Sequence, residues 1–219
     1  MSIPNAGAGR PLTFSSRSSE NGLSPTVVAV YERLLREILA GERPAGSTIK
    51  DLEIANELGV SRTPVREALL LLRSVGVIEV SASRFTRVAI VDLEELRKLS
   101  RVCLTLYCYV VEELAARGLS SDDLAPLERA HAAMEATDDL YAFVQQKFRF
   151  FEAVAVLSDD THLLRALDAV IHALHLGMLT HLDRIRREPI LHSQALLIAA
   201  LRAGDPAAAR AAIDVLRLD

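Results

Sequence analysis

The segment LGVSRTPVREALLLL, residues 58–72, places two arginines four residues apart at the start of an apolar helical pattern. If Ser61 caps the helix, the apolar side chains share one face, and Arg62 and Arg66 share a flank that points outward. A guanidinium donates a fork of hydrogen bonds that matches guanine O6 and N7 or a phosphate. The hydroxyls of Ser61 and Thr63, with the free N–H groups of the first turn, suit a phosphate. This pattern predicts DNA contacts, whereas the alternative is a solvated charged flank.

The elements around this segment support the DNA-binding alternative. Helical periodicity over 25–40, 50–58 and 61–74 predicts three short helices, separated by the turns GERPAGST and LGVS. VIEVSAS and FTRVAIV then alternate in polarity around a polar tip at 81–84, which predicts a hairpin. Three helices followed by a hairpin form a winged helix-turn-helix. Arg84 and Arg87 lie at and beside the tip, where a wing would meet the DNA backbone or minor groove.

The remaining chain has only helical patterns, over about 92–117, 121–136, 139–157, 161–183, 189–203 and 205–216. Six amphipathic helices with short loops predict one antiparallel bundle. The fold class is therefore mostly α, with an N-terminal winged helix-turn-helix and a C-terminal all-α bundle. We expect a flexible tail over 1–23, a DNA-binding domain over 24–91, and an effector-binding and dimerisation domain over 92–219.

The composition limits the class of protein. The chain has 219 residues, a net charge of −4 and two cysteines. An acidic total does not exclude DNA binding by one small domain. Two cysteines five apart in one helix predict no disulfide, and no apolar run approaches a membrane span. The polar first residues have no signal-peptide core, so we expect a cytoplasmic protein without membrane contact.

These motifs resemble a known family. GSTIKDLEIANELGVSRTPVREALLLLRSVGVIE is similar to the DNA-binding half of the GntR family of bacterial transcription regulators, and LGVSRTPVREAL is its most specific part. The rest resembles the FadR-type subfamily, whose FCD ligand-sensing domain is a helical bundle with a buried cavity. The residues that carry this second resemblance are DLEEL, Arg101, the loop at 158–164 and ALRAGD.

For DNA binding, the resemblance implies base or phosphate contacts from Ser61, Arg62, Thr63 and Arg66, and wing contacts near Ser83, Arg84 and Arg87. The sequence departs from the family pattern in two places. Where an acidic residue and an arginine often begin the second helix, this chain has Asp51 and Leu52, so one arginine is missing. The hairpin tip, SASRF, lacks the usual glycine.

Many FadR-type sensor domains hold a divalent metal with one Asp and three His. The corresponding positions here are Lys147, Phe151, His192 and Leu216, of which only His192 could be a ligand. We therefore predict no metal and no cofactor. His172 and His175 lack the partner carboxylates of a di-metal bundle and are expected on a partly exposed helix face.

In place of a metal site, we expect a cavity with a basic lining. Arg101, Lys147, Arg149 and His192 could give a lining suited to a carboxylate, a phosphate or an acyl thioester. The alternative for Lys147 and Arg149 is a solvated flank.

The resulting prediction is a ligand-responsive transcription regulator, by family resemblance a repressor, which binds a near-palindromic DNA operator as a homodimer. A small-molecule effector, for which the basic lining favours an anion, would bind in the bundle and release the DNA. A second class is a helical-bundle enzyme or metal-binding protein with an accessory winged module. Against it, the sequence has no nucleophile–base pair and no glycine-rich phosphate loop. A third alternative is a regulator whose cavity binds nothing.

Overall fold

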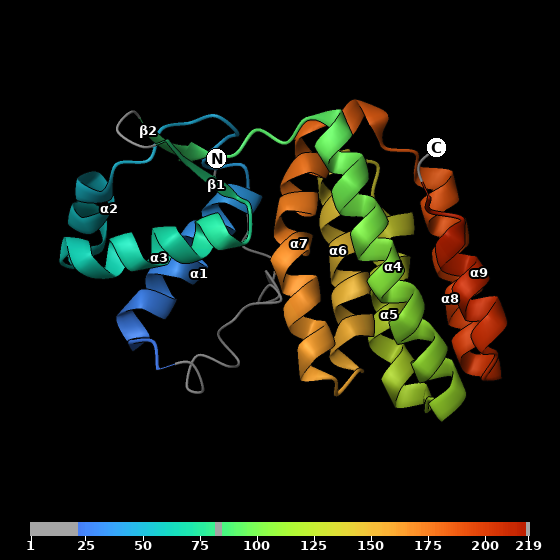
Figure 1. Cartoon of the computed structure of the whole chain (residues 1–219). Helices are drawn as coiled ribbons and strands as arrows, with labels where there is room; N and C mark the ends of the chain where they lie inside the picture. Colours follow the sequence, from blue (N-terminus) through green and yellow to red (C-terminus); the bar gives the residue numbers. More distant parts are fainter. Residues whose placement is uncertain (1–21, 82–84, 218–219) are drawn as a thin grey trace.

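The computed structural model describes residues 22–81 and 85–217. Its N-terminal part contains three helices and a two-stranded antiparallel sheet (Figure 1), which confirms the winged helix-turn-helix order. Nearly all of the predicted tail, and Ser83 and Arg84 of the predicted wing, lie outside the described residues. The elements of this part are α1 Pro25–Leu39, α2 Asp51–Leu58, α3 Arg62–Ser74, β1 Ile78–Ser81 and β2 Phe85–Val88.

Local signals in the sequence account for the ends of these helices. The Ser24 hydroxyl accepts a hydrogen bond from the Val27 N–H at 3.3 Å, and Pro25 occupies the first turn of α1. Gly59 ends α2 with a left-handed backbone, φ +65°, which a glycine adopts without strain. The apolar face of α3 packs against α1 and α2, so the opposite flank of α3 remains exposed.

The C-terminal part is an antiparallel bundle of helices, as predicted (Figure 1). It begins at Asp92, whose carboxylate accepts a hydrogen bond from the Glu95 N–H at 2.8 Å. Its members are α4 Leu93–Arg117, α5 Ser121–Glu135, α6 Leu140–Val156, α7 Thr161–Thr180, a short 3-10 helix Leu182–Arg184, α8 Arg187–Ala203 and α9 Pro206–Asp214.

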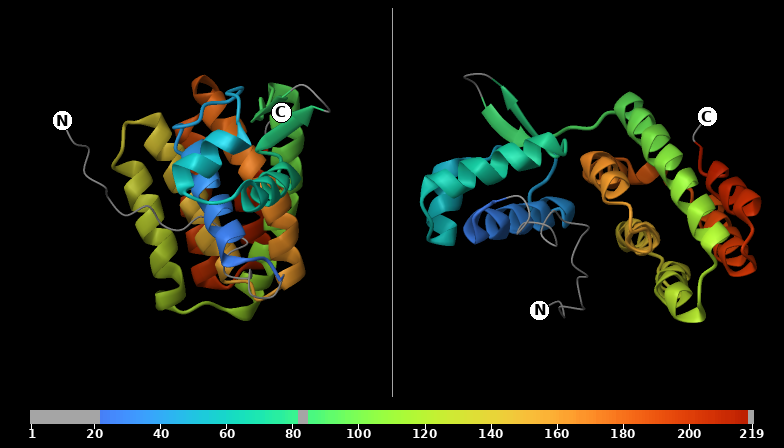
Figure 2. Two further views of the ribbon diagram at one scale, coloured as in Figure 1. Left: turned by 90° about the vertical axis from the view of Figure 1, so that its left-hand side faces the viewer. Right: turned by 60° about the horizontal axis from the view of Figure 1, so that its bottom comes forward.

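Within the bundle, helix α7 faces the N-terminal part, and it packs against α1 of that part as well as against α4 and α6 (Figures 1 and 2). Its length and composition would allow it to cross a membrane, but 56% of its apolar window is buried inside the protein, as in a core helix. Hydrogen bonds also connect the two parts. Tyr141 and Gln145 of α6 both donate to the Leu39 carbonyl at the end of α1.

The expectation that His172 and His175 lie on a partly exposed face was wrong. Both are buried, because they lie in the part of α7 that is enclosed by its neighbours, and α1, α4 and α6 pack against this helix. His172 Nε2 lies 3.1 Å from an Asp168 carboxylate oxygen, and the His175 ring stacks on Phe148 with centroids 3.9 Å apart. Burial, with smaller contributions from His172 and Lys147, lowers the pKa of His175 to about 3, so its ring is neutral at physiological pH.

Candidate nucleic-acid interface and ligand cavity

The structure brings Arg62 and Arg66 together on the exposed flank of α3, where one carboxylate of α2 holds both. Arg62 donates to Asp51 through Nε at 3.2 Å and through Nη2 at 2.9 Å, and Arg66 donates through Nε at 2.7 Å. The two arginine side chains are 51% and 63% exposed. These ion pairs lower the pKa of Asp51, first through Arg66 and then through Arg62. Asp51 therefore remains charged and fixes the direction of both guanidinium groups.

The two arginines differ in the donors that remain available. Arg62 uses Nε and Nη2 on Asp51, whereas Arg66 uses only Nε. Both terminal nitrogens of Arg66 can therefore donate to one base or phosphate, which is the geometry of a bidentate contact. The sequence marked Asp51 only as a family position, and its role became visible when folding placed the start of α2 beside the first turn of α3.

Ser61 and Thr63 are exposed at the start of α3. Ser61 is the N-cap residue by backbone geometry, but its hydroxyl accepts no hydrogen bond from the helix. Arg87 is the one predicted wing residue that the structure describes; it lies on β2 and donates from Nε and Nη2 to the Glu79 carboxylate on β1, at 3.0 and 2.8 Å. A DNA contact by Arg87 would therefore compete with an ion pair inside the hairpin.

A cavity of about 380 Å³ lies within the helical bundle. Its wall is formed by α4, α6 and α7, the segment that follows α7, the start of α8 and the end of the chain after α9. Apolar side chains dominate its inner surface, among them Leu96, Leu104, Phe148, Phe151, Ile171, Leu174 and Met178.

Lys147 is the cation of the inner wall. Its Nζ lies 3.1 Å from the Met178 sulfur, and 5.1 and 5.8 Å from the ring centroids of Phe148 and Phe151. No carboxylate among the described residues lies within ion-pair distance of this ammonium. Burial lowers the pKa of Lys147 to about 8, opposed by the Cys103 thiol. At neutral pH the lysine is mostly protonated, and its charge is compensated only by aromatic faces and a thioether.

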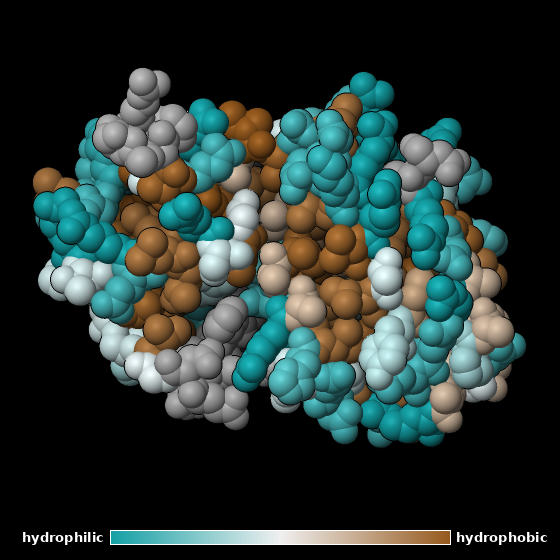
Figure 3. Space-filling model, viewed as in Figure 1, coloured by the Kyte–Doolittle hydropathy of each residue, from teal (hydrophilic) through white to brown (hydrophobic). Residues whose placement is uncertain are grey.

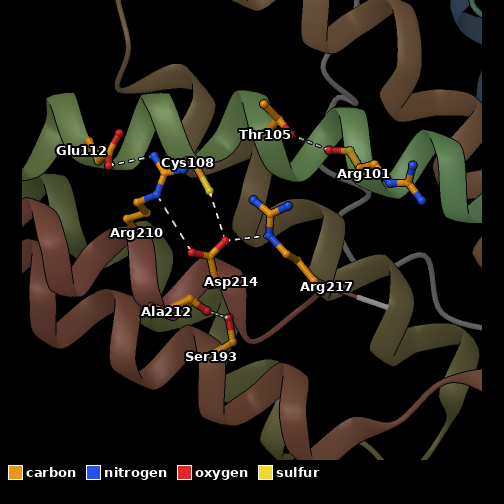
Figure 4. A network of polar contacts seen from close by, with 9 residues as sticks. All are labelled: Arg101, Thr105, Cys108, Glu112, Ser193, Arg210, Ala212, Asp214 and Arg217. Carbon is orange, nitrogen blue, oxygen red and sulfur yellow. Dashed lines mark hydrogen bonds and ion pairs between the residues drawn. The ribbon is translucent and has the colours of Figure 1, made fainter. Parts of the chain in front are cut away.

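The other three predicted effector residues do not line this cavity. Arg101 is exposed on α4, where the sticks in Figure 4 show it beside Thr105, whose hydroxyl donates to the Arg101 carbonyl at 2.8 Å. Arg149 follows Lys147 by two positions, so it faces a different side of α6. His192 is exposed on α8. Only Lys147 of the predicted set therefore faces the cavity.

Sequence reasoning missed the other cations of the lining, which are Arg97, Arg184, Arg186 and Arg217. All four are exposed, and no aspartate or glutamate is among the lining residues that the structure describes. Arg184 pairs with Asp183, and Arg217 pairs with Asp214 at 2.7 Å in the network of Figure 4. Arg97 had a signal in the sequence, because it lies about one helical turn before Ser100 and two turns before Leu104, on the face of α4 that lines the cavity.

The residues at the family's metal positions do not fit a divalent cation. Lys147, Phe151 and Leu216 line the same cavity, whereas His192 does not. An ammonium repels a cation, and phenyl and alkyl groups cannot coordinate one. Within residues 22–81 and 85–217, no three His, Cys, Asp or Glu side chains are grouped so that they could hold a metal.

Comparisons with known proteins support both parts. Residues 26–88 match the model of bacterial regulatory proteins of the gntR family, and residues 98–216 match the FCD domain model. A protein of Paenarthrobacter nicotinovorans named "Probable D-xylose utilization operon transcriptional repressor" is 28% identical over 200 residues, which span 87% of this chain and 86% of that protein. The structure of Escherichia coli McbR/YncC is 27% identical, covers 88% of this chain and 93% of its own, and superimposes with a TM-score of 0.71. The structure of a Rhodococcus sp. RHA1 protein named "putative transcriptional regulator GntR" shares the fold. It is 21% identical, covers 87% of this chain and 93% of its own, and superimposes with a TM-score of 0.72.

Proposed function

The chain belongs to the gntR family of bacterial regulatory proteins and carries an FCD effector-binding domain, so it is a transcription regulator with a DNA-binding helix-turn-helix. From this premise we propose that it is a cytoplasmic repressor, which binds a near-palindromic operator as a homodimer and is released by a small anionic metabolite. Repression is proposed because a similar protein is named a transcriptional repressor. No catalytic step belongs to this function.

The single observation that carries the proposal is the shared ion pair of Arg62 and Arg66 with Asp51. It supports a prepared base-reading surface, because the two guanidinium groups lose less conformational freedom when they meet DNA. Arg66, with both terminal nitrogens available, is the proposed base-reading residue, while Arg62, Ser61 and Thr63 contact phosphates. Arg87, Ser83 and Arg84 remain proposed wing contacts.

A dimer is proposed on geometric grounds. Two recognition helices must enter successive major grooves about one helical turn apart, so the bundle must hold two copies at that spacing. Large apolar side chains on the bundle surface support such a contact, among them Val102 and Tyr109 of α4, each 48% exposed, and Val156 of α6. Figure 3 shows hydrophobic residues gathered over the middle of the bundle on one face of the molecule.

The experiment that tests the function is selection of randomised duplex DNA by the purified protein. We expect an inverted repeat with the wild type and no enrichment with the Arg62→Ala/Arg66→Ala double variant. A matched control is Arg129→Ala/Arg202→Ala, which removes two exposed arginines from the bundle. No enrichment by the wild type at moderate salt, or equal enrichment by the α3 double variant, would contradict the proposal.

A further inference from the structure

We propose that the bundle cavity binds an organic dianion with an apolar body, whose inner acidic group pairs with Lys147 and whose outer acidic group pairs with Arg97 and Arg186. This inference rests on the proposed function, because it names the chemical class of the effector. In this proposal the Lys147 ammonium takes the place that the metal ion has in many FadR-type domains.

The inner end of the cavity is suited to one anionic group. The Lys147 ammonium faces aromatic rings and the Met178 thioether, and these are poor acceptors compared with a carboxylate. A charge in an apolar wall is costly unless it is paired, so a ligand anion placed at Nζ would gain a strong, poorly screened interaction. One acidic group fits here, because Lys147 is the only cation of the inner wall among the described lining residues.

The outer end is suited to a second anionic group. Arg184 and Arg217 already pair with Asp183 and Asp214. Arg97 and Arg186 form no ion pair with any residue that the structure describes, although both line the cavity and are exposed. These two guanidinium groups, together with the absence of carboxylates among the described lining residues, favour an acid over a neutral or cationic ligand.

The wall between the two ends selects the body of the ligand. It is formed mainly by Leu, Ile, Met and Phe side chains, and its few polar groups are partly engaged. The Tyr107 hydroxyl donates to the Phe151 carbonyl at 3.0 Å, and the Cys103 thiol is buried. A sugar or other polyol would lose hydrogen bonds with water that this wall cannot replace. An aliphatic or aromatic carbon chain loses none, and a cavity of about 380 Å³ accepts a small one.

The test is calorimetric titration of the full chain, in the presence of a chelator, with straight-chain α,ω-dicarboxylates of increasing length and with the monocarboxylates of equal length. We expect one diacid length to bind at least about tenfold more tightly than its monoacid. Lys147→Met should weaken that diacid by about tenfold or more, and Arg97→Gln/Arg186→Gln should remove its advantage over the monoacid. Arg149→Gln, beside Lys147 on α6 but outside the cavity, is the matched control and should bind normally.

Three results would overturn the inference: equal binding of diacid and monoacid, no binding of any acid, or binding that requires an added metal. The comparison of diacid and monoacid uses only the wild type, so it remains decisive if a variant fails to fold. Selection of DNA by the same preparation separates the two hypotheses. A protein that enriches an operator but does not discriminate diacids disproves only the ligand class, whereas one that binds a diacid but enriches no DNA disproves only the proposed regulator.

Discussion

At the scale of single residues, this chain holds its functional cations in two different ways. Arg62 and Arg66 share the carboxylate of Asp51 at an exposed site, where water and salt keep the ion pairs weak. Lys147 has no carboxylate partner among the described residues and lies in an apolar wall. The first arrangement orients cations at little energetic cost. The second lowers stability in exchange for a strong interaction with a ligand.

The orienting role of Asp51 leads to a prediction about DNA recognition. Asp51→Ala should lower the ratio of operator to nonspecific affinity by about tenfold, because both arginines lose their fixed direction. Nonspecific affinity should not fall, since one negative charge near the DNA is removed. The measurement is fluorescence anisotropy with the selected operator and a scrambled duplex at one salt concentration. Glu53→Ala removes an equal charge from α2 without touching either arginine, and an equal loss of discrimination in that variant would contradict the role of Asp51.

The buried charge of Lys147 should lower the free energy of unfolding by a measurable amount. Burial holds its folded-state pKa at about 8, below the ordinary value of 10.5, so the folded protein binds a proton less readily than the unfolded chain. The resulting destabilisation is fully present below pH 8 and disappears as the pH rises toward 10.5. Lys147→Met should therefore raise the free energy of unfolding at pH 7 by about 1–3 kcal/mol, with a smaller gain at pH 10. Urea denaturation at both values tests this, and a gain that grows with pH would contradict it.

At the scale of elements, the packing of α7 sets the position of the linker between the two parts, residues 89–92, which connects β2 to α4. Gly177 lies directly under the linker, where an added Cβ would be 2.8 Å from Val91 Cγ1 and 2.9 Å from Leu96 Cδ1. These contacts are too short for a methyl group, so the glycine is required by close packing. The next helical turn adds a polar contact, because His181 Nε2 lies 2.8 Å from the Val91 carbonyl oxygen.

A substitution at Gly177 tests this packing. Alanine favours a helix by about 1 kcal/mol, but overpacking costs about 1–3 kcal/mol, so Gly177→Ala should be destabilising on balance. Adding Val91→Ala makes room for the new methyl group, and we expect the double variant to recover part of the loss. Chemical denaturation of the wild type, both single variants and the double variant gives the coupling energy. Additive effects would show that the two residues do not press on each other.

The helices and strands were largely predictable from the sequence, whereas the packing of each helix against distant parts of the chain was not. Caps at Ser24 and Asp92 and the stop at Gly59 gave helix ends within a few residues, because these signals are local. The burial of His172 and His175 was missed because it depends on tertiary packing: α1 and α4, both distant in the sequence, cover α7 together with α6, whose Phe148 stacks on His175. The prediction that Arg101 and Arg149 line the cavity was wrong for a simpler reason. Arg149 is two positions from Lys147, and Arg101 is next to the cavity-lining Ser100 of α4, but helical geometry turns both arginines away from the cavity.

At the scale of the whole molecule, the helix-turn-helix part rests on the bundle through α7 and the start of α6. Tyr31 of α1 and Asp168 of α7 face each other across this boundary, and burial followed by the charge of Asp168 raises the pKa of the Tyr31 hydroxyl. That hydroxyl and one Asp168 oxygen are buried without a hydrogen-bond partner among the described residues. Unsatisfied buried groups are costly, so this boundary is less stable than an apolar core. His181, which lines the cavity and contacts Val91, links the cavity to the same boundary.

The hydrogen bonds from Tyr141 and Gln145 to the Leu39 carbonyl hold the DNA-binding part in one placement, and their removal is the last prediction. In Tyr141→Phe/Gln145→Leu, amide hydrogen exchange should accelerate in residues 38–41 and 89–92, because local opening no longer breaks these bonds. Operator affinity should fall by at least about threefold, since two loosely held recognition helices must be ordered when they enter successive grooves. Arg202→Gln, which removes an exposed ion pair with Glu128 inside the bundle, should change neither quantity. If exchange accelerates while operator affinity is unchanged, the docked placement does not contribute to DNA binding, and a ligand in the bundle would have to act by another route.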